Sequence, residues 1–363
     1  MHAWAGAVLS LLLAILGLSG ALLVFEDDYL RASFPPARIE VPADPATLGQ
    51  IAERAEATFG AGAILSIRFA DTGFGLTEVR LKSGGGAYLD GAGELVVPWA
   101  GNGRPEVWLF DLHHHLLVGE TGEIVTGIAG LAAVLLTITG LIALWPARRM
   151  QGLRIWPRTP QRRELLASHR NLGLMAAVPL LWFAISGAGM VFSEQTRAVL
   201  SVLNGPQTSA ATTAPATLAA GPGDLDWTTA LTQAQAQFPQ ARIRFAVWPR
   251  GSRSEASVRL RQPGEWHPNG RSSVSFDPAS QRLLAVSDAR TAPRSDQVYN
   301  GFYPLHAARI GTGLAARLYD MLTALTGLAL FALGALGCYA FLVKRVGAFR
   351  RLRTASAREW RTR

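Results

Sequence analysis

Cysteine is almost absent from this sequence, whose 363 residues contain one, Cys338. A single thiol cannot form a disulfide within the chain, so dithiol redox chemistry is excluded. Other signatures are missing too: the sequence has no Ser-His-Asp nucleophile elbow, no Walker loop and no dinucleotide-binding fingerprint. The glycine-rich segment SGGGAYLD predicts a hairpin turn, because no helix follows it to hold a phosphate.

Charge is missing from four long stretches, residues 3–25, 124–147, 172–193 and 321–343. About 20 apolar residues in a helix cross a ~30 Å hydrocarbon core, and buried helices of soluble proteins rarely run this long without a charge. The sequence therefore predicts four transmembrane helices. The first run is too long for the core of a signal peptide, and no A-x-A site follows it, so we expect an uncleaved anchor.

Basic residues gather at the ends of two of these runs. The segment 148–170 carries seven Arg against Glu164, and the segment 344–363 carries eight Lys and Arg against Glu359. Basic flanks stay on the cytoplasmic side of a membrane. We therefore expect both termini and the central loop to be cytoplasmic and the two long intervening segments to lie outside. Because the net charge of +9 comes from span ends, we do not expect nucleic acid as a partner.

The two halves of the chain repeat one pattern. Starting from a histidine at the beginning of the first and third runs, matching residues recur at offsets of +4, +17, +18, +23 and +25. The matched residues are His2, Gly6, Ser19, Gly20, Phe25 and Asp27 in the first copy and His169, Gly173, Ser186, Gly187, Phe192 and Glu194 in the second. The first and third spans are thus predicted to be copies.

The two outer segments also match. Each begins with an amphipathic helix, at residues 44–60 and 225–239, followed by runs that alternate polar and apolar residues as half-buried strands do. LDGAGELV and FDPASQRLL are equivalent hairpins, with Asp90 at the position of Asp277. The fold class is therefore a membrane α-helical protein, four transmembrane helices in a duplicated two-helix unit, with two small α+β periplasmic domains.

These features resemble the PepSY-associated transmembrane proteins. The likeness is carried by a span that begins with His, a small α+β domain and the run LHHHLLVGETGEIVTGIAGL leading into a span that ends in LWP, all duplicated. That family includes iron-regulated membrane proteins and haem-containing ferric-siderophore reductases of bacteria. The resemblance implies a bacterial inner (cytoplasmic) membrane location, PepSY-like outer domains and bound haem, and it does not specify the substrate.

The expected boundaries follow from the spans and the repeat. They are 1–25 for the first transmembrane helix, 26–106 for the first PepSY-like domain, 107–147 for an interfacial segment with the second helix, 148–170 for the basic cytoplasmic loop, 171–193 for the third helix, 194–225 for a mobile low-complexity linker, 226–303 for the second PepSY-like domain, 304–343 for an interfacial segment with the fourth helix and 344–363 for a basic cytoplasmic tail.

Six of the seven histidines lie at span ends, in two groups. These are His2 and His169 on the cytoplasmic side and His113, His114, His115 and His306 on the outer side. Two imidazoles on facing helices can hold the iron of haem b from both sides. We therefore expect two b haems per chain. The cytoplasmic pair would hold the inner haem, and His306 with one of the three adjacent histidines would hold the outer one.

Successive residues of a helix point ~100° apart, so the three adjacent histidines cannot all face one iron. An L-H motif shared with YPLHAARIGTG favours His113 and leaves His114 as the alternate. A zinc site that adds Asp111 and Glu120 to these histidines is a further alternative. His113 precedes the uncharged run by eleven residues, and this segment either extends a helix outward or bends back at the glycines 119 and 122; both arrangements remain open.

The leading functional hypothesis is a haem-dependent electron carrier that reduces a periplasmic acceptor, with ferric siderophores as the main candidate. No flavin or nicotinamide motif is present, so electrons would come from quinol or from a cytoplasmic reductase. The alternative is a non-redox membrane protein whose PepSY-like domains bind peptides or restrain a periplasmic partner. A transporter is disfavoured because the four runs contain no charged residue, and near the membrane midplane only Pro179 interrupts one of them.

Overall fold

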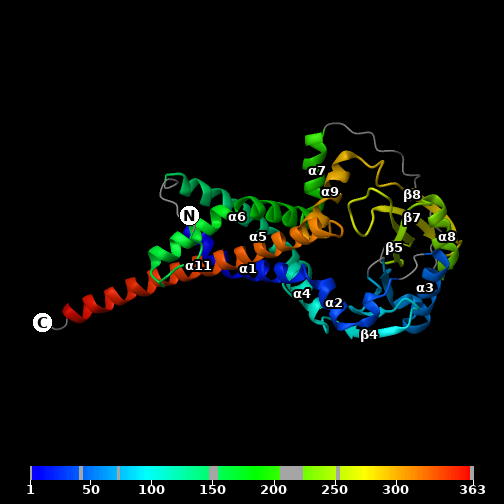
Figure 1. The fold of residues 1–363 in the computed structure, drawn as a ribbon, viewed down its shortest axis with the longest axis horizontal. Helices are drawn as coiled ribbons and strands as arrows, with labels where there is room; N and C mark the ends of the chain where they lie inside the picture. The colour runs from blue at the N-terminus through cyan, green and yellow to red at the C-terminus, as the bar shows by residue number, and fades with distance from the viewer. Residues whose placement is uncertain are drawn as a thin grey trace. The chain divides into compact units, whose positions relative to one another are not determined.

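The computed structural model describes residues 2–40, 44–71, 74–146, 154–204, 224–250 and 254–359. The chain divides into two compact units, which we call the helical unit and the sheet unit (Figure 1). The helical unit consists of Met1–Val24, Leu109–Phe192 and Arg317–Arg363, and the sheet unit of Phe25–Trp108 and Ser193–Ala316. Each unit therefore contains residues from both halves of the repeat.

The helical unit is built from α1 (His2–Leu23), α5 (Gly119–Leu144), α6 (Arg162–Val191) and most of α11 (Leu314–Glu359). Within the described residues, three segments are long and apolar enough to cross a membrane: Gly119–Leu144, Arg162–Val191 and Leu314–Val343. A fourth is added if Leu9–Leu23 and Glu26–Ser33, which meet at a bend of 51°, count as one span. A helix closes its backbone hydrogen bonds internally, as hydrocarbon requires.

Glycines let the long helices approach closely. A Cβ at Gly17 would lie 2.5 Å from the carbonyl oxygen of Gly327, and one at Gly334 would lie 2.5 Å from that of Ser10. These contacts bring the backbones of α1 and α11 together in the small-residue packing typical of membrane helices. Gly130 of α5 also lies near the backbone of α6, although less closely, since its Cβ would be 3.2 Å from a carbonyl oxygen. Gly17 thus serves helix packing.

The sheet unit contains one antiparallel sheet with the strand order β4-β3-β2-β1-β5-β6-β7-β8. Each outer segment supplies one helix and four strands. The first supplies α3 (Pro45–Phe59), β1 (Ile64–Arg68), β2 (Thr77–Leu81), β3 (Gly85–Leu89) and β4 (Leu95–Ala100), and the second supplies α8 (Trp227–Gln237), β5 (Arg242–Val247), β6 (Ala256–Arg261), β7 (Ser272–Asp277) and β8 (Arg282–Ser287). These helices and strands match the sequence predictions.

The two outer segments share one sheet and one core. β1 pairs with β5 in antiparallel register, with Ile67 opposite Ala246. The helices α3 and α8 pack so closely that a Cβ at Gly49 would lie 2.1 Å from Oγ1 of Thr228. The sequence predicted two separate small α+β domains, whereas in the structure both outer segments form one sheet with a shared core. Pairing β1 with β5 satisfies two strand edges that separate four-stranded sheets would leave open.

The equivalent hairpins have equivalent turns. Oδ1 of Asp90 accepts a hydrogen bond from the backbone N–H of Ala92 at 2.9 Å, and Oδ1 of Asp277 accepts one from that of Ala279 at 3.1 Å. Aspartate commonly stabilises turns in this way, by binding the backbone two residues on. The match between the two positions, expected from the sequence, is confirmed.

The segment 194–225 differs from the predicted linker. Its first part forms α7 (Ser193–Asn204), in which Arg197 pairs with Asp296 of α9 (Arg294–Asn300). The Arg197 guanidinium also lies 4.0 Å from the ring centroid of Tyr299. Contacts with a segment about a hundred residues later therefore hold this part as a helix. The low-complexity run, residues 206–223, lies outside the described residues.

Short elements complete the chain: α2 (Glu26–Ser33), η1 (Pro35–Arg38), η2 (Ala61–Ala63), α4 (Pro105–His115) and α10 (Phe302–His306). Two helices extend past their expected boundaries. α6 begins at Arg162, within the predicted basic loop, and α11 continues from the fourth apolar run to Glu359, within the predicted tail. Arg and Lys are good helix formers, so the basic flanks continue these helices.

Candidate functional site

The predicted ligand histidines lie in both units. His169 lies in α6, and the three adjacent histidines end α4, all in the helical unit. His306 ends α10 in the sheet unit. His2 begins α1, and its side chain lies outside the described part of the structure.

His113 is held by the two residues at offsets +17 and +18 of the first repeat, Ser19 and Gly20, which we call the His113 seat. Nδ1 of His113 lies 2.9 Å from Oγ of Ser19, and that hydroxyl donates to the carbonyl oxygen of Ile15 at 2.8 Å. The His113 ring also forms a hydrogen bond with the backbone of Leu16, so two neighbours on α1 fix its orientation. A Cβ at Gly20 would lie 2.9 Å from Cε1 of the ring.

Burial also keeps His113 neutral. Desolvation, together with the neighbouring His114, lowers the pKa of His113 to about 4. The neutral imidazole is the form that binds a metal. α4 precedes the apolar helix α5, so this histidine is a partly buried base next to a candidate span.

A tight turn between α4 and α5 explains how His113 reaches α1. Leu116 and Leu117 adopt positive φ angles of 51° and 63°, which non-glycine residues rarely adopt. After the turn, Gly122 packs on the backbone of His115, where a Cβ would lie 1.6 Å from the carbonyl oxygen. The chain therefore folds back at Gly119 and Gly122 instead of extending as one helix. This settles the two arrangements that the sequence allowed.

His169 contacts the backbone of α11. Its Nδ1 lies 3.1 Å from the carbonyl oxygen of Leu333, and a carbonyl can only accept, so Nδ1 carries the proton and Nε2 the lone pair. One turn further along α6, a Cβ at Gly173 would meet only a side-chain carbon of Leu333, at 3.7 Å. At Gly6, the equivalent position of α1, a Cβ would meet nothing within 4 Å. Gly6 and Gly173 each lie one turn after a predicted ligand histidine, His2 in α1 and His169 in α6, and both leave space beside their helix.

His306 is followed by an anchored turn. Ala308 has a positive φ of 54°, and the next residue, Arg309, forms ion pairs with Glu26 at 3.1 Å and with Asp27. These contacts tie the segment after His306 to the start of α2 within the sheet unit. The predicted pairing of His306 with His113 joins residues of the two units, and it stays a prediction.

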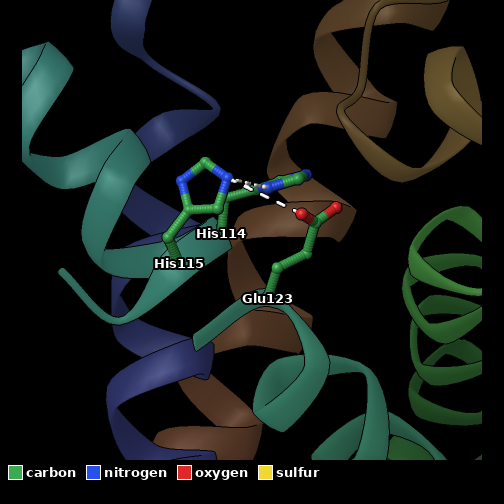
Figure 2. Close-up of side chains that lie close together, drawn as sticks. All are labelled: His114, His115 and Glu123. Carbon is green, nitrogen blue, oxygen red and sulfur yellow. Dashed lines mark hydrogen bonds and ion pairs between the residues drawn. The ribbon is translucent and has the colours of Figure 1, made fainter. Parts of the chain in front are cut away.

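The other two adjacent histidines contact each other, with Nδ1 of His114 3.2 Å from Nε2 of His115. Figure 2 shows the rings of His114 and His115 and the carboxylate of Glu123 pointing toward one another. One nitrogen of each ring and one carboxylate oxygen lie within 4.8 Å of one another, and we call these three residues the His-Glu cluster. The sequence had suggested Glu120 as a carboxylate near these histidines, but Glu120 is exposed. Glu123 lies one turn further along α5.

Two features of these sites escaped the sequence analysis. The duplicated Ser19-Gly20 pair was noted, but its role in holding His113 was not; the pair recurs as Ser186-Gly187 in the second repeat. The seventh histidine, His267, lies in a loop, and its side chain is buried and stacks on Tyr303 at 4.8 Å between ring centroids. Burial lowers the pKa of His267 to about 3.

A bundle of apolar helices and a sheet built from two matching halves together define a helical membrane protein with a folded α+β unit. The family model for the PepSY-associated TM region matches residues 1–344, and the chain belongs to that family. The resemblance seen in the sequence is thereby confirmed. Among proteins with curated descriptions, none matches the chain.

Proposed function

We propose that the chain is a di-haem electron-transfer protein of the bacterial inner membrane, which passes electrons outward to a periplasmic acceptor. Ferric siderophores are the proposed acceptor class, and the activity is that of a membrane ferric-siderophore reductase. The His113 seat is the observation that carries the proposal, because it presents a partly buried imidazole that desolvation keeps neutral and that Ser19 orients.

The donor set fits a b-type haem. His169 directs Nδ1–H to the carbonyl oxygen of Leu333, and Nδ1 of His113 is hydrogen-bonded to the hydroxyl of Ser19. Such bonds orient ligating histidines and make the other nitrogen a better ligand. His2 is the proposed partner of His169 and His306 that of His113, while His114 becomes a less favoured alternate because its ring faces His115.

The chain's own residues would orient and enclose the cofactor. Gly6 and Gly173 leave open space one turn beyond the two inner histidines, where a bulkier side chain would intrude. A haem with two imidazole ligands exchanges single electrons and offers no open position to a substrate. Relay, rather than chemistry on a bound ligand, is therefore the proposed activity.

The proposal also assigns roles to the termini, the basic central loop and the sheet unit. Both termini and the basic central loop would lie in the cytoplasm, where a quinol or a cytoplasmic reductase supplies electrons. The sheet unit would lie in the periplasm and bind or shield the acceptor. Reduction of Fe(III) to Fe(II) weakens binding by hard oxygen ligands, so one electron per iron is sufficient to release it.

Absorption spectra of the detergent-purified full chain, oxidised and dithionite-reduced, test the cofactor. We expect the spectrum of low-spin b-type haem. Stopped-flow mixing of the reduced protein with ferric siderophores tests the acceptor, and haem reoxidation must be faster than in an anaerobic blank. A colourless protein would exclude the redox function and favour a protein whose PepSY-like domains bind peptides or restrain a partner.

A further inference from the structure

We propose that the His-Glu cluster is a binding site for one divalent first-row transition-metal ion, held by Nδ1 of His114, Nε2 of His115 and the carboxylate of Glu123. This site does not use the favoured haem ligands His2, His169, His113 and His306; it takes His114, the alternate, for a different metal, and it does not depend on the proposed function. Two imidazoles and a carboxylate form a ligand set that suits Zn²⁺ and Fe²⁺.

The spacing of the nitrogens fits shared coordination. Nδ1 of His114 lies 3.2 Å from Nε2 of His115. Two nitrogens bound tetrahedrally to one zinc at 2.0–2.1 Å would lie about 3.3 Å apart. The carboxylate oxygen Oε2 of Glu123 lies 4.0 Å from Nε2 of His115, so a modest rotation of the glutamate side chain completes a three-ligand set.

Asp111 sets the tautomer of His115. Its Oδ1 lies 2.8 Å from Nδ1 of His115, and a carboxylate accepts, so Nδ1 carries the proton and Nε2 directs its lone pair toward His114 and Glu123. A carboxylate behind the histidine is the usual support of a metal-binding imidazole. With Asp111 and Glu123, two carboxylates stand beside two imidazoles, which complements the charge of a dication.

The surrounding structure holds the ligands in place. The ring of Phe110 stacks on that of His114, with 5.3 Å between centroids and 10° between planes. The hydroxyl of Thr126 donates to the carbonyl oxygens of His114 at 3.1 Å and of Glu123 at 2.7 Å, which links the end of α4 to the start of α5. The turn between the two helices contains the positive φ angles of Leu116 and Leu117, and such strained backbone often accompanies binding sites.

The cluster is open enough to admit an ion. The side chains of His115 and Glu123 are 28% and 35% exposed. Three protein ligands leave a coordination position for water or another ligand, as in zinc sites that are not purely structural. Hard cations such as Mg²⁺ and Ca²⁺ prefer all-oxygen sites and should bind poorly here.

Zinc titration of the full chain tests the proposal. The detergent-purified protein is treated with EDTA, dialysed and titrated with ZnCl₂ by calorimetry, and bound metal is measured by elemental analysis. We expect one Zn²⁺ per chain that Mg²⁺ does not displace. Glu123→Gln and His115→Ala should remove this binding, and Asp111→Asn should weaken it about 10–100-fold. Glu120→Gln, which changes an exposed carboxylate one turn earlier, is the matched control and should bind as wild type does.

Equal zinc isotherms for the wild type and Glu123→Gln would overturn the site, as would an equal loss in Glu120→Gln. A measurement on the wild type alone guards against misfolded variants. Zn²⁺ should protect His114 and His115 from acylation by diethyl pyrocarbonate, detected by peptide mass spectrometry, and unchanged acylation would also reject the site. A colourless protein that still binds zinc here would refute the proposed haem function and leave this site intact.

Discussion

Gly20 of α1 lies against His113 of α4, so closely that a methyl group at position 20 would be 2.9 Å from Cε1 of the imidazole. This relationship links a glycine of the repeated pattern to the histidine of the L-H motif. Two residues 93 positions apart therefore form one site (113 − 20 = 93).

Gly20→Ala should displace the His113 ring, because the contact is shorter than any real Cβ makes. We expect loss of the outer haem or a changed Soret band, measured as the haem-to-protein ratio and the absorption spectrum of purified protein. Leu22→Ala, at an exposed position of the same helix, is the control and should keep the wild-type spectrum. If Gly20→Ala keeps both haems with an unchanged spectrum, His113 is not a ligand.

His169→Ala should remove the inner haem and His306→Ala the outer haem, so each variant should retain one of two. The pairing of His169 with His2 needs its own test. The carbonyl that accepts from His169 belongs to the residue before Gly334, and Gly334 packs on Ser10 of α1. Ser10 is roughly 12 Å along the helix from His2, so the two histidines begin at different levels of the bundle. If His2→Ala and His169→Ala remove different haems, judged by their reduction potentials, the proposed inner pair is incorrect. Leu174→Ala, exposed on the same helix as His169, serves as the control.

Glu56 should make the stability of the sheet unit depend on pH. Burial raises the pKa of this carboxyl, although the indole N–H groups of Trp227 and Trp248 donate to it at 2.9 and 2.8 Å and oppose the shift. A raised pKa in the folded state favours the protonated form. The contribution of Glu56 to the free energy of unfolding should therefore be fully present below its unfolded pKa, 4.5, and should be lost as pH rises through its folded pKa.

Glu56→Gln should abolish this contribution, because the amide oxygen can still accept from both indoles but does not titrate. The measurement is thermal unfolding followed by tryptophan fluorescence between pH 4 and pH 8. Glu40→Gln removes an exposed carboxylate that is not among the charges acting on Glu56, and it should leave the pH profile as in wild type. An unchanged profile in Glu56→Gln would assign the pH dependence to other groups.

Asp226→Ala should lower the free energy of unfolding of the sheet unit by about 1 kcal/mol, the usual contribution of a helix N-cap. Oδ1 of Asp226 accepts from the backbone N–H of Thr229 at 2.9 Å, as Asp44 does from Thr47 at the start of α3. Urea unfolding measures the loss, and Asp226→Asn, which keeps an accepting oxygen, should be near wild type. Equal losses in both variants would mean that the charge matters and the cap does not.

Reporter fusions test the orientation. Fusions after Gly60 and Arg250 should behave as periplasmic, and one after Ile155 as cytoplasmic, because seven Arg follow the second apolar run. A cytoplasmic signal at Gly60 would reverse the arrangement and remove the physical basis for outward electron flow.

Local properties of the sequence were sufficient for much of this description. Apolar runs marked the long helices, alternation marked the strands, and equal offsets revealed the duplication and matched Asp90 with Asp277. Hydrophobicity, period and turn chemistry depend on residues close together in the chain, so they are visible without a fold. The family membership was also recognisable from such local motifs.

Packing between distant segments determined the rest. The pairing of β1 with β5 depends on two strand edges more than 170 residues apart, which no local pattern encodes. The choice of Glu123 over Glu120 beside His114 and His115 follows from the strained turn at Leu116 and Leu117, which sets which face of α5 meets α4. Backbone strain of this kind is maintained only when surrounding contacts compensate for it, so it emerges only when the helices are packed together.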